Sequence, residues 1–503
     1  MFTVLPHAAR LGRRLAALAL LGPAALAAQQ PAAAPPAVPL SLQDALALAR
    51  QNNPDYQAQR NDLDVARWQV RQANADFIPG ASASTSFGYT ASGERRFGSV
   101  GFGEQPSSYS SSYDLGLSLS VSGSKLLQPR LARAQQRATV QRVEGADATL
   151  TAQVTQQYLS VLQAQETVAQ AERDLARTGE YVRLAQARFD VGAGTPLDVR
   201  RAEVQQGQAE VRLVQAQSTL ATSLLTLGQL LGTPLSDSTT LSSQFRLFEP
   251  TWNAAELTER ALRNNPLLVA ARATSEAART GVQAARSTYL PTLSFSAGWR
   301  GYAQRYGELD GLVSSQLRNM QPNYLGCLQQ NEIRTRVGLA TSPCTNPADP
   351  AVAAEIRNGL EDQNSAYPFD YTRQPLSASM TVSLPIFTGL QRELQVQRAR
   401  ADAEDARYQV RAQELRLQAD VAAAVRNLQT AYRTAQLQEK VRATAAEELR
   451  LAQERFRYGA ANSIEVTDAQ TNLAEAERAQ IDAVYNFHKS LAALEALLGE
   501  PLR

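Results

Sequence analysis

The 503-residue chain has few of the residues that carry metal and acid–base chemistry, with only two histidines and two cysteines. His7 lies in a segment that we expect to be removed, and His488 has no ligand-type residue near it in the sequence. A Gly-x-Ser-x-Gly motif is also absent. We therefore predict a protein that is not an enzyme and has no cofactor and no metal site. The formal net charge of +2 gives no indication of a nucleic-acid partner.

Long apolar runs are scarce as well. The first run, Leu15–Ala28, follows three arginines and is shorter than the ~20 residues of a membrane-spanning helix. Small residues at its end offer a cleavage site, so residues 1–28 are predicted to be a secretory signal peptide. Residues 29–39, rich in alanine and proline, are predicted to form a flexible N-terminus. No later run is apolar and long enough for a transmembrane helix, so the exported chain is either soluble or built on membrane strands.

What the sequence does contain is an internal duplication. Asn52–Pro54 recurs 212 positions later as Asn264–Pro266, and Arg188–Gly192 recurs 267 positions later as Arg455–Gly459. The difference between the two offsets places one extra insertion in the second half. The predicted organisation is a first repeat at 40–235, a linker at 236–252 and a second repeat at 253–503, with the insertion at about 301–375.

Two segments in each half alternate apolar residues with serine, threonine or glycine. They are residues 81–89 and 115–121 in the first half, and 293–299 and 376–386 in the second. A period of two predicts strands, and these are about as long as the ~9–11 residues that a tilted strand needs to cross a bilayer. A soluble sandwich would alternate in the same way, but the chain offers no other strands for a second sheet. Four strands cannot close a barrel, so strands in a membrane require several copies of the chain in one β-barrel.

The remainder of each half is predicted to be helical. Each half opens with a helical segment, at 41–77 and 253–289, and continues after the strands with a long helix, at 125–189 and 391–456. A returning helix follows each long one, at 196–231 and 463–498. A run of about 65 residues would be about 100 Å long. These runs are too polar for a globular core and favour helices packed side by side around a water-filled bore, although a plain structural coiled coil stays open.

At this point the sequence resembles the TolC family of outer-membrane efflux proteins over about Leu40–Leu502. The resemblance is carried by the duplication, the two Asn-Asn-Pro motifs, Leu384–Phe387 and the duplicated Arg-Phe-x-x-Gly turns. It implies an α+β membrane protein, a homotrimer with a shared twelve-stranded β-barrel in the outer membrane and an α-helical barrel in the periplasm. It also implies a passive exit channel of a tripartite efflux or type I secretion system. The implied partners are outer-membrane lipid, a periplasmic adaptor (membrane fusion) protein and an inner-membrane RND or ABC pump. The rival reading is a periplasmic structural or adaptor coiled-coil protein.

The resemblance also implies roles for residues at the periplasmic tip. Residues of the tip turns and of adaptor docking would be Phe189, Gly192, Thr195, Phe456, Gly459 and Asn462. By position, Asp198, Glu465 and Asp468 would line a pore constriction, while the alternative makes them solvated acids or helix caps. Phe456 and Ala461 stand where some relatives place the tyrosine and arginine of a closing lock, so a lock in this chain needs other contacts.

The insertion at about 301–375 is rich in glycine, proline, asparagine and serine. It joins two predicted strands at the end away from the long helices, so we expect an extracellular loop. Cys327 and Cys344 are the only cysteine pair of an exported chain, which favours a disulfide, with two free thiols as the alternative.

Overall fold

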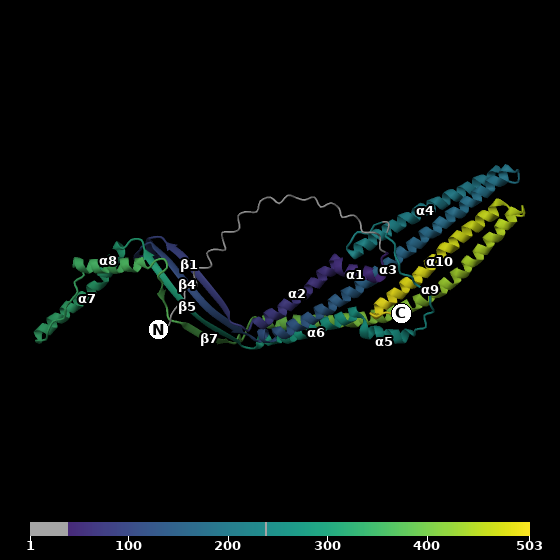
Figure 1. Ribbon diagram of the computed structural model, residues 1–503. Coiled ribbons are helices and arrows are strands. Elements are labelled where there is room, and N and C mark those ends of the chain that lie inside the picture. The colour runs from purple at the N-terminus through teal and green to yellow at the C-terminus, as the bar shows by residue number, and fades with distance from the viewer. Residues whose placement is uncertain (1–38, 237–238, 503) are drawn as a thin grey trace, which may run out of the picture.

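The computed structural model of the protein describes residues 39–236 and 239–502. The predicted signal peptide at 1–28, and all but the last residue of the predicted flexible N-terminus, lie outside these described residues. The molecule is elongated, with long helices at one end, a sheet in the middle and a smaller helical arm at the other end (Figure 1). Among the described residues, no helix combines the length and the apolar character needed to cross a membrane.

The two repeats contain corresponding elements in the same order. The first contains α1 (Leu42–Asn52), α2 (Pro54–Ala75), β1 (Gly80–Thr90), β2 (Gly93–Phe97), β3 (Val100–Gln105), β4 (Ser108–Val121), α3 (Gly123–Asp190) and α4 (Pro196–Leu231). The second contains α5 (Ala254–Asn264), α6 (Pro266–Arg286), the 3-10 turn η1 (Ser287–Tyr289), β5 (Thr292–Tyr306), α7 (Asp310–Arg336), α8 (Pro350–Ser365), β6 (Thr372–Arg373), β7 (Ser377–Ser383), α9 (Gln391–Arg457) and α10 (Ser463–Leu498). The predicted returning helices have the observed bounds, and the predicted long helices differ from α3 and α9 by at most two residues at each end.

The sheet is antiparallel and has the order β1-β4-β5-β7, with the short β6 paired to the far end of β5. The register brings Leu117 of β4 opposite Ala81 of β1 and Ala297 of β5, so the apolar positions of neighbouring strands share one face. Ala297 in turn pairs with Ala378 of β7. Within the described chain, β1 and β7 are the outer strands, and each pairs along one edge only.

The four long helices form two antiparallel hairpins, α3 with α4 and α9 with α10, and α10 also packs along α3 (Figure 1). The order across this wall is therefore α4, α3, α10, α9. Because α3 starts at Gly123 directly after β4, the sheet and the helical wall are continuous through the same chain segments.

A junction near the middle of the molecule explains the duplicated Asn-Asn-Pro motif. The Asn53 carboxamide oxygen accepts a hydrogen bond from the Tyr56 N–H at 2.9 Å, and its NH₂ group donates to the Leu230 carbonyl at 2.9 Å. Asn53 thus caps α2 and also satisfies a carbonyl at the end of α4. Asn265 repeats both bonds in the second repeat, at 2.8 and 2.9 Å, the longer one to the Leu497 carbonyl.

The duplicated Leu-Gly-x-Pro-Leu motif forms the other side of the same junction. Gly232 and Gly499 end α4 and α10 with φ angles of +72° and +74°, which residues other than glycine rarely adopt. A Cβ on Gly232 would lie 2.2 Å from the Asn52 carbonyl oxygen, and one on Gly499 would lie 2.8 Å from Pro266. Because glycine has no Cβ, the backbones of the two motifs can approach each other this closely, although the motifs are far apart in the sequence.

Three large apolar clusters, and a small alanine cluster between α3 and α6, join the helices of the described chain. One joins α1 to α3 and α4 around Tyr158, and its counterpart joins α5 to α9 and α10 around Phe487. His488, beside it, is buried with its ring 5.3 Å from that of Phe245. The third cluster lies toward the tip and is richer in alanine, with Tyr181 and Phe456 as its aromatic residues. Short alanine side chains let the helices approach closely there.

Several sequence expectations differ from the structure. The opening segments predicted at 41–77 and 253–289 are each divided, at Asn53 and Asn265, because a proline follows and the asparagine leaves the helix to cap the next one. The strand predicted at 376–386 ends at Ser383, before Pro385 removes a ladder donor. The expected loop at about 301–375 contains α7 and α8, and Cys327 and Cys344 form a disulfide there. A β2–β3 hairpin also lies between β1 and β4, where no strand was predicted.

Candidate functional site

The predicted tip residues gather at the far ends of the two helical hairpins. Gly192 has φ +76° and Gly459 has φ +75°, so each turn uses its glycine in the left-handed region. Neither glycine has another atom within 4 Å of the position of a Cβ, so backbone conformation and not space requires glycine here. Phe189 is 41% exposed at the first turn, whereas Phe456 is only 4% exposed at the second. The duplicated phenylalanines therefore have different surroundings.

The arginine of each Arg-Phe-x-x-Gly motif holds its own turn. The Arg188 guanidinium donates to the Ala193 carbonyl at 3.1 Å, and the Arg455 guanidinium donates to the Ala460 carbonyl at 3.2 Å. Each bond closes a loop across five residues and satisfies a carbonyl beyond the helix end. The arginine in both copies of the motif therefore stabilises its own turn, a role that the sequence alone does not indicate.

Arg188 also reaches the other hairpin. Its guanidinium lies over the Phe456 ring, 4.4 Å from the centroid, and donates to the Phe456 carbonyl. The Tyr181 ring packs on the same phenylalanine with centroids 5.8 Å apart, and burial raises the pKa of Tyr181 to about 12. Ala461 packs against this cluster. Phe456, which the resemblance puts at the position of a lock tyrosine, thus has a ring that an arginine of the opposite hairpin covers.

Asp198 lies at the start of α4, where it completes a capping box. Its carboxylate accepts from the Thr195 N–H at 3.0 Å and from the Thr195 hydroxyl at 2.8 Å, and the Asp198 N–H donates to that hydroxyl oxygen at 3.3 Å. A hydrogen bond from the Ser463 hydroxyl, together with the Thr195 bonds, lowers the pKa of Asp198 below its ordinary value. Asp198 therefore serves as a cap and also contacts the first residue of α10.

Glu465 and Asp468, predicted together at a pore constriction, have different neighbours. Asn462 caps α10 by accepting from the Glu465 N–H at 3.1 Å, and the Glu465 carboxylate forms a 3.0 Å ion pair with Arg455 of its own hairpin. Asp468 instead lines a cavity of about 390 Å³ between α4 and α10, together with Arg201. Within one chain, the two carboxylates therefore have different neighbours, and their shared role at a constriction stays a prediction.

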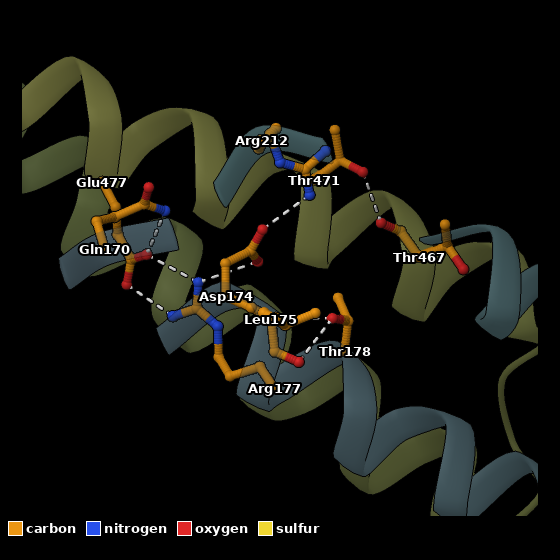
Figure 2. Close-up of polar contacts among 9 residues, drawn as sticks. All are labelled: Gln170, Asp174, Leu175, Arg177, Thr178, Arg212, Thr467, Thr471 and Glu477. Atoms are coloured by element: carbon orange, nitrogen blue, oxygen red, sulfur yellow. Dashed lines mark hydrogen bonds and ion pairs between the residues drawn. The ribbon is translucent and has the colours of Figure 1, made fainter. Parts of the chain in front are cut away.

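A partly buried ionic network, with Asp174 as its buried member, joins the two hairpins above the tip (Figure 2). The Asp174 carboxylate, 4% exposed, accepts from Arg212 of α4 at 2.7 Å and from Arg177 at 3.4 Å. Arg177 also donates two bonds to Glu477 of α10, at 2.7 and 2.8 Å, and the Gln170 amide donates to Glu477 at 3.2 Å. Every charge in the network has an opposite partner, which is the condition for burying ions.

The surroundings of this network fix its geometry further. The Thr178 hydroxyl donates to the backbone carbonyls of Asp174 and Leu175, both at 3.0 Å, one turn earlier on α3 (Figure 2). Burial raises the pKa of Glu477, but the hydrogen bonds from Arg177 and Gln170 outweigh it and hold the pKa below the ordinary value. The network could not be recognised from the sequence because Glu477 lies 300 positions from Arg177, Arg212 is on a different helix from Asp174, and the members follow no motif.

Comparison with known proteins places this architecture. The profile of the family described as "Outer membrane efflux protein" matches residues 45–233 and 350–500, which is more than half of the chain. The chain belongs to the outer membrane efflux protein family. It is accordingly an outer-membrane protein whose helical part extends into the periplasm.

Individual members of the family are distant relatives. The cobalt-zinc-cadmium resistance protein CzcC of Cupriavidus metallidurans is 27% identical over 262 residues, which is 52% of this chain and 58% of that protein. The outer membrane efflux protein BepC of Brucella suis is 34% identical over 140 residues, which is 28% of this chain and 30% of that protein. The chain thus matches less than two thirds of the length of these relatives.

Solved structures extend the likeness to nearly the whole fold. The CmeC outer membrane channel of Campylobacter jejuni has a TM-score of 0.69 at 17% sequence identity, with 91% of this chain and 85% of that chain covered. The family profile leaves 234–349 unmatched, which includes the linker, α5, α6, β5 and α7. The structural match therefore shows that the fold continues through segments in which the family sequence pattern is weak.

Proposed function

We propose that this chain is the passive exit channel of a tripartite efflux or type I secretion system, and that three copies assemble into one duct. The observation that carries the proposal is the sheet order β1-β4-β5-β7, in which the two outer strands, β1 and β7, each pair along one edge only. Unpaired N–H and C=O groups along such edges are not tolerated in lipid. Since β1 and β7 run in opposite directions in this order, β7 of one copy and β1 of the next would continue the antiparallel pattern. Three copies would then close twelve strands.

The helical wall supports the same assembly. Its two lateral helices, α4 and α9, carry rows of exposed apolar side chains. These are Val204, Val211, Val214 and Leu225 on α4, and Leu437, Val441 and Leu451 on α9. On each helix these residues recur at helical spacing and form one stripe. In the proposed trimer, α9 of one copy would cover α4 of the next, as α10 covers α3 within one chain.

The tip supports docking of a periplasmic adaptor. Val191 and Tyr458 project from the two turns, and both are exposed, as is Phe189. Apolar side chains at a solvated turn are typical of a surface that a partner covers. We propose that this end binds the adaptor (membrane fusion) protein and, through it, an inner-membrane RND or ABC pump. The opposite end, with α7, α8 and their disulfide, would be extracellular, and no catalytic step is proposed for any part of the duct.

The proposal is tested by oligomeric state and conductance. Detergent-extracted protein is expected to have the mass of a trimer by native mass spectrometry and to form pores in planar bilayers. Val211→Glu combined with Val441→Glu places charge on both lateral stripes, so the variant is expected to lose the trimer and the pores. Val337→Glu, at a similarly exposed valine beyond α7, is the matched control and should retain both. Recovery of the wild type as a soluble periplasmic monomer would contradict the proposal and favour the coiled-coil alternative.

A further inference from the structure

A polar cavity of about 580 Å³ lies above the tip, between α4 and α10, with α3 as its floor. It is formed by one chain, so no neighbouring copy is needed to complete it. Its walls combine short side chains with hydroxyls, amides and four charged groups. The charged groups are Arg212 on α4 and Glu475, Arg478 and Asp482 on α10. A volume of this size lies in the range of small-molecule sites, about 300–1,000 Å³.

The cavity and the linker between the repeats lie on opposite faces of α3. The Tyr158 hydroxyl donates to the Leu40 carbonyl at 2.7 Å, and the Gln165 amide donates to the Thr239 carbonyl at 3.4 Å. Tyr158 and Gln165 each precede a cavity residue, Ser160 and Thr167 respectively, by two positions. Two positions correspond to about 200° around a helix, so the linker contacts and the cavity lie on opposite faces of α3. A linker with its flanking helices would fill the bore if it lay inside the duct. If the proposed duct holds, the linker is outside and the cavity faces the bore.

The charged groups of the cavity differ in how they are held. Arg212 is fixed by the buried Asp174 carboxylate (Figure 2), and Asp482 accepts a 2.6 Å hydrogen bond from the Gln163 amide. Glu475 and Arg478 are exposed, and within the described residues neither forms an ion pair or a side-chain hydrogen bond. The wall therefore presents one negative and one positive group without partners, three positions apart on the same helix.

We infer that this cavity binds an amphoteric organic solute of drug size on its way through the duct, with an ammonium group at Glu475 and a carboxylate at Arg478. Residues three apart on a helix have Cβ atoms about 5–6 Å apart, so the two groups can engage both ends of one small zwitterion. Thr219 and Gln215 on the facing wall supply neutral hydrogen-bonding groups. This inference rests on the proposed function for the placement of the cavity in the bore.

A bare metal cation fits the cavity less well. Arg478 and the fixed Arg212 would repel it, and among the described residues no group of three His, Cys, Asp or Glu side chains is arranged to hold a metal ion. A purely apolar molecule would leave both free charges unsatisfied, which costs binding free energy. The opposite signs of Glu475 and Arg478 therefore select for a ligand that carries both charges.

The test uses norfloxacin as the zwitterionic probe and the purified full-length protein. Titration calorimetry is expected to detect binding to the wild type, weakened roughly tenfold, or about 1.4 kcal/mol, in Glu475→Gln/Arg478→Gln. Glu259→Gln/Arg263→Gln removes the same two charges from α5, on the opposite side of the wall, and is expected to bind as the wild type does. Methylammonium and acetate, each with one of the two charges, are expected to bind much more weakly.

A second readout separates this inference from the proposed function. In planar bilayers, norfloxacin is expected to interrupt the current through the wild-type pore for longer than through the Glu475→Gln/Arg478→Gln pore. Equal binding of norfloxacin to the wild type and to this variant would overturn the inference even if both conduct. Charge-dependent binding by a wild type that forms no pore would overturn the proposed function and leave the binding site standing.

Discussion

The two seams of the helical wall differ although the two repeats that form them are related. Within one chain, α3 meets α10 through the network of Asp174, Arg177 and Glu477. The residues 267 positions after Asp174 and Arg177 are Val441 and Thr444, so α9 is uncharged at the two corresponding positions. The seam between α3 and α10 within the chain is polar and held by ion pairs, whereas the seam proposed between α9 and α4 of the next copy is apolar. The duplication thus preserves the hairpins and lets each seam acquire its own chemistry.

The largest expected loss of stability comes from breaking the ionic network between α3, α4 and α10. Asp174→Ala leaves Arg212 without its carboxylate partner while Arg177 keeps Glu477, and breaking a pair with a buried carboxylate in this way costs up to about 3–5 kcal/mol. Val441→Ala, at the corresponding and exposed position of α9, is expected to cost under about 1 kcal/mol. Urea unfolding followed by the helical circular dichroism signal measures both. Equal losses in the two variants would remove the distinction between the seams.

Where the repeats agree, matched changes should have matched results. Gly232→Ala and Gly499→Ala place a Cβ in a left-handed position and against a backbone or proline, so each is expected to cost about 2–4 kcal/mol. The effect should be larger at Gly232, where the overlap is closer. Gly326→Ala, in the middle of α7 with open space around it, is expected to stabilise by up to about 1 kcal/mol. A neutral result at Gly232 in the same unfolding assay would contradict the junction.

At the tip, the comparison of the two motif arginines is sharper. Arg188→Ala removes a contact to the opposite hairpin worth about 1.5–3 kcal/mol, whereas Arg455→Ala removes bonds within one hairpin. We expect single-channel conductance to rise in Arg188→Ala and to stay near the wild-type value in Arg455→Ala. The opposite order would mean that the contacts within each turn, and not the contact between the hairpins, limit the conductance at the tip.

The two predicted pore acids are expected to differ modestly. Glu465 is neutralised by Arg455, while Asp468 lines the open cavity between the hairpins. Asp468→Asn is therefore expected to lower the preference of the pore for cations about twofold, and Glu465→Gln less than that. Reversal potentials in a salt gradient report this preference. A larger loss in Glu465→Gln would show that the Arg455 pair is broken in the open pore.

The smallest expected effect is a pH dependence of the stability that Glu477 contributes through the ionic network. The pKa of Glu477 is held below its ordinary value of 4.5, so its contribution to stability is fully present above that value and is lost as pH falls through the lowered pKa. Glu477→Gln should therefore be less stable than the wild type at pH 7, with a difference that shrinks well below pH 4.5. Thermal unfolding midpoints at the two pH values test this. A constant difference would assign the effect to packing instead of charge.

Much of the fold was predictable because the sequence marks it locally. Pro196 and Ser463 begin the returning helices as predicted, since capping residues and prolines act within one turn. The strands follow from their period of two. The β2–β3 hairpin alternates apolar residues with glycine only over Val100–Gly103, a shorter run than in the predicted strands, and α7 contains Pro322, so neither was recognised from local pattern.

The candidate site was predictable only in part, and for a different reason. Gly192 and Gly459 were recognised because a turn requires them at a fixed place in a motif. Nothing in the sequence indicated that Arg188 meets Phe456 or that Asp174 meets Arg212, because those contacts depend on how the hairpins pack. The exposed pair of Glu475 and Arg478 likewise gains meaning only from the cavity around it.

The distance between the ionic network and the tip has a mechanical consequence. Asp174 lies about 24 Å along α3 from the helix end at Asp190, at 1.5 Å per residue. If the network is the fulcrum about which the hairpins rotate, the segment below it is a lever arm, and a tilt of about 10° moves the turn by about 4 Å. A partner that grips the tip therefore needs to supply only a small rotation, while the wall above the fulcrum keeps its cross-section.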